Sequence, residues 1–434
     1  MTAEIAILNK GAVTLATDSA VTLTVRGAQK IYNCADKLFE LSDHDPIGIM
    51  VFNNLSFMGV QLDVAIKKFR SGKGNVHYAS VVEASEAFFR YLEDDLLPSA
   101  DLQRQHAKAI LNSLLNSVLS EFRSASVFEW EKRKSRTDFP AIFAGIVEQK
   151  VRSLEGLDVA GCFSGIPEHE IASFYEEVIT EVIAKGFAGL PLTDEHKITL
   201  RRVCVLTLIR DEYSALLTGV VFAGFGKDEI FPSLVAYEID GIIFNRLKKR
   251  ETRRVVANRP GIAGEIIPFA QREMVDRFLY GIDPELEGGI EEYLELAIES
   301  AGDAIVQALP KLRAATKAKV RKSIDGAADA ALAGWCEKIL PAVKNRFMRE
   351  VRDMVYLMPK QELAALAQEL INLTSVKRKF SSGQDSVGGP IDVAVISKID
   401  GFVWVRRKHY FEPGLNPRYF HRKFGLHAKV GDLS

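Results

Sequence analysis

The sequence has little of what marks several common protein classes. Only four cysteines occur in 434 residues, far apart and without a Cys-x-x-Cys pair, which argues against a disulfide framework or a zinc site. No apolar run reaches the ~18 residues that span a membrane. The N-terminus has no charged segment followed by an apolar one, as a secretory signal has. We therefore expect a cytoplasmic protein without a membrane partner.

Strong net charge and cofactor motifs are also missing. The net charge is −1, so no overall field attracts nucleic acid, and we expect no nucleic-acid partner. The motifs GxGxxG, GxxxxGK[ST], HExxH and GxSxG do not occur. The eight histidines have no ligand spacing. The sequence therefore implies no metal and no organic cofactor.

The first residues carry the most informative pattern that is present. Two strand-like segments, 4–9 and 12–17, meet at a Lys-Gly turn and end at Asp18. If Met1 is removed, Thr2 combines a hydroxyl with a free α-amine, which together form a nucleophile–base pair. The unperturbed pKa of an α-amine is about 7.7–8.0, near working pH. The alternative is that Thr2 is an ordinary second residue.

Strands and helices occur in separate runs along the chain. Strand-like patterns are expected at 4–9, 12–17, 31–32, 37–41, 47–52, 216–226, 233–241, 391–397 and 402–405. Helical patterns are expected at 56–70, 80–95, most of 100–200, 268–280, 290–350 and 362–374. Runs of like elements favour an α+β fold over alternating βαβ units.

Several separated segments together resemble the proteasome β-subunit type of N-terminal nucleophile hydrolases. The resemblance is carried by Thr2 through Ala16-Thr17-Asp18, by Lys37-Leu38-Phe39-Glu40-Leu41, and by Gly388-Gly389-Pro390-Ile391-Asp392-Val393-Ala394-Val395-Ile396 followed by Asp400-Gly401. Weaker matches are Val221-Phe222-Ala223-Gly224, Tyr237-Glu238-Ile239-Asp240-Gly241 and Pro268-Phe269-Ala270. Their order and spacing cover about half of the chain.

The resemblance implies a four-layer αββα sandwich, two antiparallel sheets between helical layers, with large helical insertions. It divides the chain into core (1–95), helical insertion (96–200), core (201–284), helical insertion (285–350), core (351–410) and a C-terminal tail (411–434). It further implies cleavage of peptides or unfolded proteins and a ring-like homo-oligomer, and it leaves room for an ATPase partner.

The resemblance gives Thr2 two supporting residues, Asp18 and Lys37. A lysine cation beside the nucleophile favours its anionic form and keeps the amine neutral. A carboxylate paired with that lysine keeps it charged and oriented. Lys30 competes for the lysine role, and we prefer Lys37 because residues 38–41 fit the strand that follows the lysine in the family.

The oxyanion site is expected in the tight loop after strand 47–52. The family has a glycine there, and this chain has Asn53. Asparagine is one of the few other residues that tolerate a left-handed backbone. We therefore place a backbone N–H donor for the oxyanion at Asn53.

The C-terminal loop departs from the family pattern. Strict register puts Gln384 and Val387 where the family has an aspartate and a serine that support the threonine amine. Asp385 and Ser386 lie one residue away and are the candidates for that role. A further supporting serine is missing, and Glu265 is the nearest polar residue.

Three functions remain open at this stage. The first is a threonine hydrolase, an endopeptidase with Thr2 as nucleophile. The second is a catalytically silent assembly subunit, which the altered C-terminal loop would suit. The third keeps the nucleophile but gives it a small-molecule amide as substrate.

Overall fold

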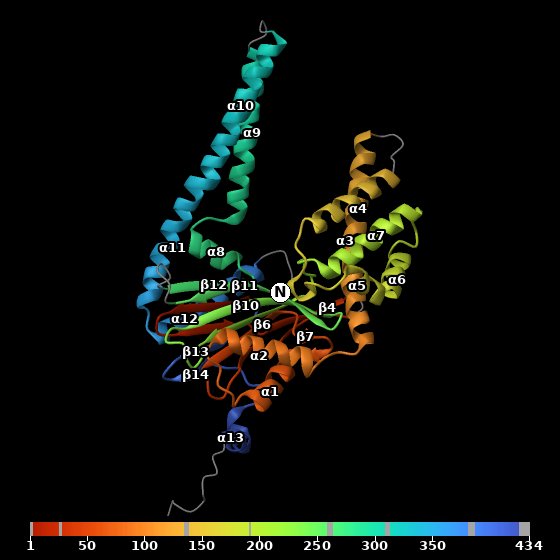
Figure 1. The fold of residues 1–434 in the computed structure, drawn as a ribbon. Helices are drawn as coiled ribbons and strands as arrows, with labels where there is room; N and C mark the ends of the chain where they lie inside the picture. Colours follow the sequence, from red (N-terminus) through yellow and green to blue (C-terminus); the bar gives the residue numbers. More distant parts are fainter. Residues whose placement is uncertain are drawn as a thin grey trace, which may run out of the picture.

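The computed structural model shows an α+β fold built on antiparallel sheets (Figure 1). It describes residues 3–25, 28–133, 139–190, 192–257, 264–308, 313–380 and 387–424. The predicted α+β class is confirmed at this level, whereas the complete four-layer sandwich stays a prediction. In the described ranges, no helix is long and apolar enough to cross a membrane.

The first sheet joins the two ends of the chain. Its strands are antiparallel and lie in the order β12 (Gly264–Ala270), β1 (Ala3–Asn9), β2 (Val13–Thr17), β13 (Asp392–Ser397) and β14 (Gly401–Arg406). Every residue of β1 and β2 is buried, so both faces of these strands are covered by the rest of the protein. The N-terminal strand pair is thereby fixed between a strand from mid-chain and one from near the C-terminus.

The second sheet is also antiparallel. Its order is β11 (Arg246–Val256), β10 (Ser233–Ile243), β9 (Thr218–Gly224), β6 (Ile47–Asn53) and β5 (Leu38–Glu40). Two small ribbons accompany the sheets, β3 (Ala20–Val25) with β4 (Ala28–Asn33) and β7 (Ser56–Phe57) with β8 (Val60–Gln61).

An apolar cluster lies between the inner faces of the two sheets. It includes Leu15 and Ile396 from the first sheet and Met50 and Val221 from the second. The sheets approach closely at Gly48, where a Cβ atom would come within 3.0 Å of Leu15 and 2.8 Å of Ile396. A larger residue at this position would push the sheets apart.

Helices cover the outer face of each sheet. Helices α1 (Leu62–Lys73) and α2 (Val81–Asp94) share an apolar cluster with the second sheet. Helices α8 (Glu273–Tyr280), α11 (Leu340–Leu357) and α12 (Lys360–Lys379) share another with the first. Three apolar clusters thus follow one another through the centre of the molecule.

A separate group of helices has a core of its own. It comprises α3 (Ala100–Arg133), α4 (Phe139–Glu155), η1 (Gly161–Phe163), α5 (Glu168–Phe174), α6 (Glu176–Gly186) and α7 (Asp194–Ile209). Buried Lys248 on β11 joins this group to the second sheet, because its Nζ donates to the carbonyls of Thr207 and Glu212 at 3.0 and 2.7 Å.

A long arm leaves the molecule beside α8 (Figure 1). It is built from α9 (Pro284–Ala308), α10 (Ala314–Gly334), a π-helical turn, η2 (Trp335–Ile339), and α11. The last described elements are a short 3-10 turn, η3 (Pro413–Leu415), and α13 (Pro417–Phe424). The predicted domain boundaries remain predictions.

The predicted helix 268–280 is wrong in its first part. Residues 264–270 form strand β12, and the helix begins only at Glu273. Pro268 is tolerated because β12 is an edge strand in the described part of its sheet, where a missing N–H costs no ladder bond on the outer side. The resemblance of Pro268-Phe269-Ala270 to a helix start is therefore also wrong.

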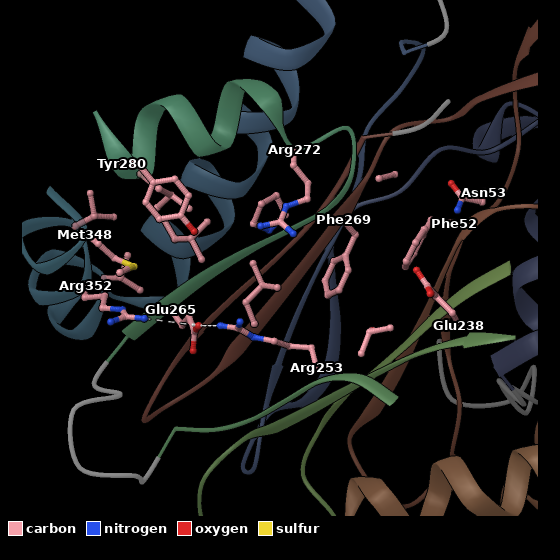
Figure 2. A pocket seen from close by; sticks show the side chains of 18 residues that line it. Phe52, Asn53, Glu238, Arg253, Glu265, Phe269, Arg272, Tyr280, Met348 and Arg352 are labelled. Carbon is pink, nitrogen blue, oxygen red and sulfur yellow. Dashed lines mark hydrogen bonds and ion pairs between the residues drawn. The ribbon is translucent and has the colours of Figure 1, made fainter. Parts of the chain in front are cut away.

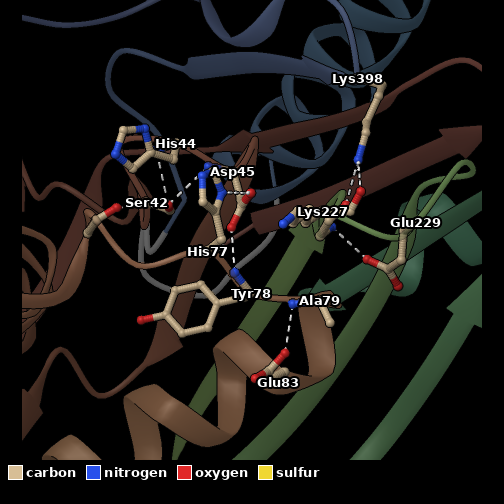
Figure 3. A network of polar contacts seen from close by, with 12 residues as sticks. Ser42, His44, Asp45, His77, Tyr78, Ala79, Glu83, Lys227, Glu229 and Lys398 are labelled. Atoms are coloured by element: carbon tan, nitrogen blue, oxygen red, sulfur yellow. Dashed lines mark hydrogen bonds and ion pairs between the residues drawn. The ribbon is translucent and has the colours of Figure 1, made fainter.

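A polar network holds the loops at the start of β6 (Figure 3). Asp45 accepts hydrogen bonds from the backbone N–H of Tyr78 at 2.6 Å and contacts His77 Nδ1 at 3.0 Å. Glu229 accepts from Gly226 N–H at 2.7 Å, and Lys398 Nζ donates to the Gly226 carbonyl at 2.6 Å. Because β6 begins here and ends at Asn53, the network anchors the end of the strand remote from the candidate site.

Candidate active site

Asp18 and Lys37 form a buried ion pair. Lys37 Nζ lies 2.6 Å from Asp18 Oδ1, and the two side chains are 0% and 1% exposed. Asp18 immediately follows β2 and Lys37 immediately precedes β5, so two sheet strands position the pair. A carboxylate is the partner that a buried lysine cation needs, because an unpaired charge in this position is very costly.

The Asp18 carboxylate also accepts hydrogen bonds from three backbone N–H groups. Oδ1 accepts from Ala3 at 3.2 Å, and Oδ2 accepts from Gly388 at 3.0 Å and Ala20 at 3.3 Å. Asp18 therefore joins the start of β1, the end of β2, the residue before β5 and the loop before β13. Ala3 and Gly388 contribute only main-chain groups, so no residue-type signal in the sequence marks them.

Ser19 strengthens the contact between Asp18 and the C-terminal loop. Its N–H donates to the Gly388 carbonyl at 3.2 Å, and its hydroxyl donates to the Pro390 carbonyl at 2.5 Å. Its own carbonyl accepts from Ala35 N–H at 3.0 Å. Sequence analysis did not identify Ser19; the sequence shows a serine directly after the acid, but its burial is seen only in the structure.

The two lysines that competed for one role lie in different environments. Lys37 is buried against Asp18, whereas Lys30 is exposed on β4. Lys30 Nζ lies over the Tyr32 ring, 5.0 Å from its centroid. The geometry brings Lys37, and not Lys30, to the acid; the catalytic role of Lys37 remains a prediction.

Three of the predicted site residues lie outside the described residues: Thr2, Asp385 and Ser386. Their immediate neighbours in the chain are described. Ala3 donates to Asp18, and Val387 is buried in the apolar cluster on the outer face of the first sheet. An apolar environment suits the valine and offers no polar support from that position.

Asn53 ends β6 with a left-handed backbone, φ +64°. The turn is fixed by Asn54, whose Nδ2 donates to the Leu216 carbonyl at 3.3 Å and whose carbonyl accepts from Thr218 Oγ1 at 2.9 Å. The geometry thus has the tight turn on which the predicted oxyanion role depends, and the role itself stays a prediction.

Ala270 is a second residue with unusual backbone geometry near this point. It has φ +58° and pairs with Ala3 at the end of β12. A positive φ is uncommon for alanine and costs free energy, and such residues cluster at functional sites. The strand β12 therefore ends in a strained residue beside the start of β1.

Glu265 lies too far along β12 to support the N-terminus. It pairs with Leu8, while Ala270 pairs with Ala3. Five residues at ~3.3 Å each separate the two positions by roughly 16 Å. Glu265 instead forms ion pairs with Arg253 and Arg352.

Two cavities have Asn53 in their lining. The first, of about 600 Å³, extends from Asn53 and Ala270 between the two sheets to helices α8 and α11 (Figure 2). The second, of about 440 Å³, lies between β3–β4 and the loops that precede α1. Both volumes fall within the range of small-ligand and peptide sites. Among the described residues, no three His, Cys, Asp or Glu side chains gather as a metal site would need.

Comparisons with known proteins found little similarity. No family model matches the chain, and no curated protein matches it. Among solved structures, it is similar to "Anbu (ancestral beta-subunit) from Yersinia bercovieri" at 8% identity and TM-score 0.27, covering 100% of this chain and 99% of that one. It is also similar to Anbu from Hyphomicrobium sp. strain MC1 at 11% identity and TM-score 0.26, covering 99% of both chains.

These findings correct the predicted family. The assignment to the proteasome β-subunit type of N-terminal nucleophile hydrolases is wrong, because no family model matches and the similar structures bear a different name. TM-scores this low carry no argument about function. The function is therefore argued from the geometry of the site alone.

Proposed function

We propose that this chain is an amide-bond hydrolase whose nucleophile is the hydroxyl of Thr2, exposed by removal of Met1. One observation carries the proposal: the Asp18 carboxylate binds both the buried Lys37 ammonium and the N–H of Ala3, the residue bonded to Thr2. A charged pair tied to the residue after a threonine provides the electrostatic support that this nucleophile requires.

The proposed reaction has two steps. The Thr2 hydroxyl oxygen attacks the amide carbonyl, and its proton passes to the α-amine and then to the departing nitrogen as the C–N bond breaks. Water then hydrolyses the resulting ester and restores the hydroxyl. The Lys37 cation favours the anionic form of the nucleophile, and Asp18 holds Lys37 charged.

The Asn53 N–H group is proposed as the donor to the oxyanion. Removal of one such donor costs ~10²–10³ in rate in enzymes that use them. The two cavities that have this residue in their lining would receive the two sides of an extended substrate. Peptides or unfolded proteins are therefore the proposed substrates. Asp385 and Ser386 are proposed to support the Thr2 amine.

The broader predictions that remain untested belong to the same proposal. Apolar clusters on both outer faces and between the sheets support an αββα sandwich. The separate helical core and the arm support the predicted insertions. Assembly into a homo-oligomer, an ATPase partner and a cytoplasmic location are proposed with them.

The test is covalent labelling with an epoxyketone peptide, which reacts with a threonine that offers both a hydroxyl and a free amine. We expect loss of Met1 and a single adduct on residue 2 of the wild type, and no adduct on Thr2→Ala. Thr199→Ala, on α7 and outside the lining of both cavities, is the matched control and should label as the wild type does. Lys37→Gln should slow labelling by at least ~10²-fold.

Intact Met1, or an unlabelled wild type, would contradict the hydrolase and favour the silent assembly subunit. If the protein is labelled and cleaves simple amides but no peptide, this would favour the hypothesis that its substrate is a small-molecule amide. Mass spectrometry and a panel of fluorogenic substrates distinguish these outcomes.

A further inference from the structure

The first of the two cavities at Asn53 has a mixed lining that points to a particular kind of ligand. Its walls come from both sheets and from α8 and α11, and every lining residue is described. Figure 2 shows Asn53, Phe52 and Phe269 at one end and Met348 and Arg352 at the other, with Arg272 projecting between them. The cavity therefore begins at the candidate site and runs under the base of the arm.

The two glutamates in the lining are already matched by arginines. Glu265 is buried and forms ion pairs with Arg253 and, at 3.8 Å, Arg352. Glu238 accepts two hydrogen bonds from Arg250, at 2.9 and 2.7 Å. Each carboxylate in the cavity lining therefore has an arginine as its counterion.

Arg272 forms an ion pair with neither of these glutamates. Among the described residues, its ion-pair partner is Asp276, where Nε lies 3.4 Å from Oδ2. This contact engages one edge of the guanidinium. Burial raises the pKa of the Asp276 carboxyl, and Arg272 opposes that shift. The terminal nitrogens of Arg272 lie between Tyr280 and Phe269, on the cavity side in Figure 2.

A guanidinium in this setting suits a carboxylate. Its planar array of N–H donors matches the two oxygens of a carboxylate, and such bonds are stronger than neutral ones. The neighbouring walls are apolar, from Phe52, Phe269, Leu279, Tyr280 and Met348. The ligand therefore offers a negative charge next to apolar surface, as an acidic peptide does and an inorganic anion does not.

We propose that this cavity binds an acidic side chain of the peptide substrate, on one side of the bond that Thr2 cleaves, through Arg272. The inference rests on the proposed function, since it assigns the cavity to that substrate. It adds a specificity that the Thr2 chemistry alone does not require: preference for aspartate or glutamate near the scissile bond.

Binding is measured on the full chain carrying Thr2→Ala, so that no turnover occurs. The probes are two fluorescent peptides that differ only in glutamate against glutamine on both sides of a central apolar pair. We expect the glutamate peptide to bind about tenfold more tightly, the size of one charge-assisted hydrogen bond. Arg272→Gln should abolish the preference, and Arg272→Lys should reduce it.

Arg254→Gln is the matched control. Arg254 neighbours Arg253 on β11, pairs with Glu251 at 2.5 Å and lies outside the cavity lining. The preference should persist in this variant. Equal binding of the two peptides, binding of neither, or equal loss in the Arg254 and Arg272 variants would overturn the inference.

The two proposals fail separately. If the wild type is not labelled at residue 2 but the glutamate preference depends on Arg272, the hydrolase proposal fails and the acidic-peptide site stands. If labelling succeeds and the peptides bind alike, the hydrolase stands and the acidic-peptide site fails.

Discussion

At the scale of single residues, Asp18 has no acceptor capacity to spare. A carboxylate offers about four lone-pair sites. Lys37, Ala3, Ala20 and Gly388 occupy all four. To take a proton, Asp18 would have to release one of these donors. Its proposed role is therefore to position Lys37 and the start of β1, and the base is left to another group.

Substitution of Asp18 by asparagine tests the energetic part of this view. Asp18→Asn leaves the Lys37 cation buried without a counterion, and we expect a loss of ~3–5 kcal/mol in the free energy of unfolding. Chemical denaturation measures it. Asp63→Asn, which breaks the exposed Lys67–Asp63 pair, is the control and should cost at most ~1 kcal/mol. Similar losses in the two variants would contradict a special role for the buried pair.

Residue types predicted part of the candidate site. The pattern after Lys37 distinguished it from Lys30, and the tolerance of asparagine for a left-handed backbone placed a tight turn at Asn53. The donors from Ala3 and Gly388 could not be predicted, because every residue except proline carries an N–H group. The pairing of β1 with β2 brings Ala3 to Asp18, and the pairing of β2 with β13 brings Gly388 there.

At the scale of elements, the edge strands were the hardest to predict. β11 carries the charged run Arg246–Val256 and is an edge strand in the described sheet, where charges discourage pairing with other chains. It lacks the alternating pattern by which buried strands are recognised. β12 was mistaken for a helix because of Pro268. The central strands, β1, β6, β9 and β13, were predicted because burial demands apolar residues.

The separate helical core predicts how its cysteines react. Burial raises the pKa of Cys162 to about 11 and that of Cys204 to about 12. Because the thiolate is the reactive form, both should resist iodoacetamide at about pH 8, while exposed Cys34 reacts. Peptide mass mapping measures this. Alkylation of Cys162 as fast as Cys34 would show that the helical group is open.

The raised pKa of Cys162 also makes stability depend on pH. Its ordinary value is 9.0 and its folded value about 11, so between these limits the unfolded chain loses a proton that the folded chain keeps. The unfolded state then binds fewer protons, and stability falls as pH rises from about 9 to about 11. Cys162→Ser removes this contribution. Between about pH 9 and about pH 11, the free energy of unfolding of the wild type should therefore fall relative to that of the variant.

At the scale of the whole molecule, we expect the arm to contribute little to the stability of the central layers. Cys336 Sγ in η2 lies 3.4 Å from Glu291 Oε1 on α9, so these two helical segments of the arm lie side by side at this level. Residues beyond it, in α9 and α10, line a groove of their own and none of the cavity at Asn53.

Excision of 292–335, with a short Gly-Ser linker from Glu291 to Cys336, should therefore leave the central fold intact. We expect the melting temperature to fall by only a few degrees and the binding of the acidic peptide to persist. Differential scanning calorimetry and peptide binding measure these. Global unfolding, or loss of binding with the fold retained, would show that the arm supports the cavity.

The convergence on Asp18 has a consequence for the newly made chain. Residues 3, 18 and 37 leave the ribosome well before Gly388, which follows residue 37 by 388 − 37 = 351 residues. At about 5–20 residues per second, the interval between residue 37 and residue 388 is roughly 20–70 s. During translation the carboxylate thus lacks one of its four donors, and β2 lacks its neighbour β13. The proposed hydrolase would be completed only after Gly388 had been made, so a copy truncated before this residue would be without a finished site.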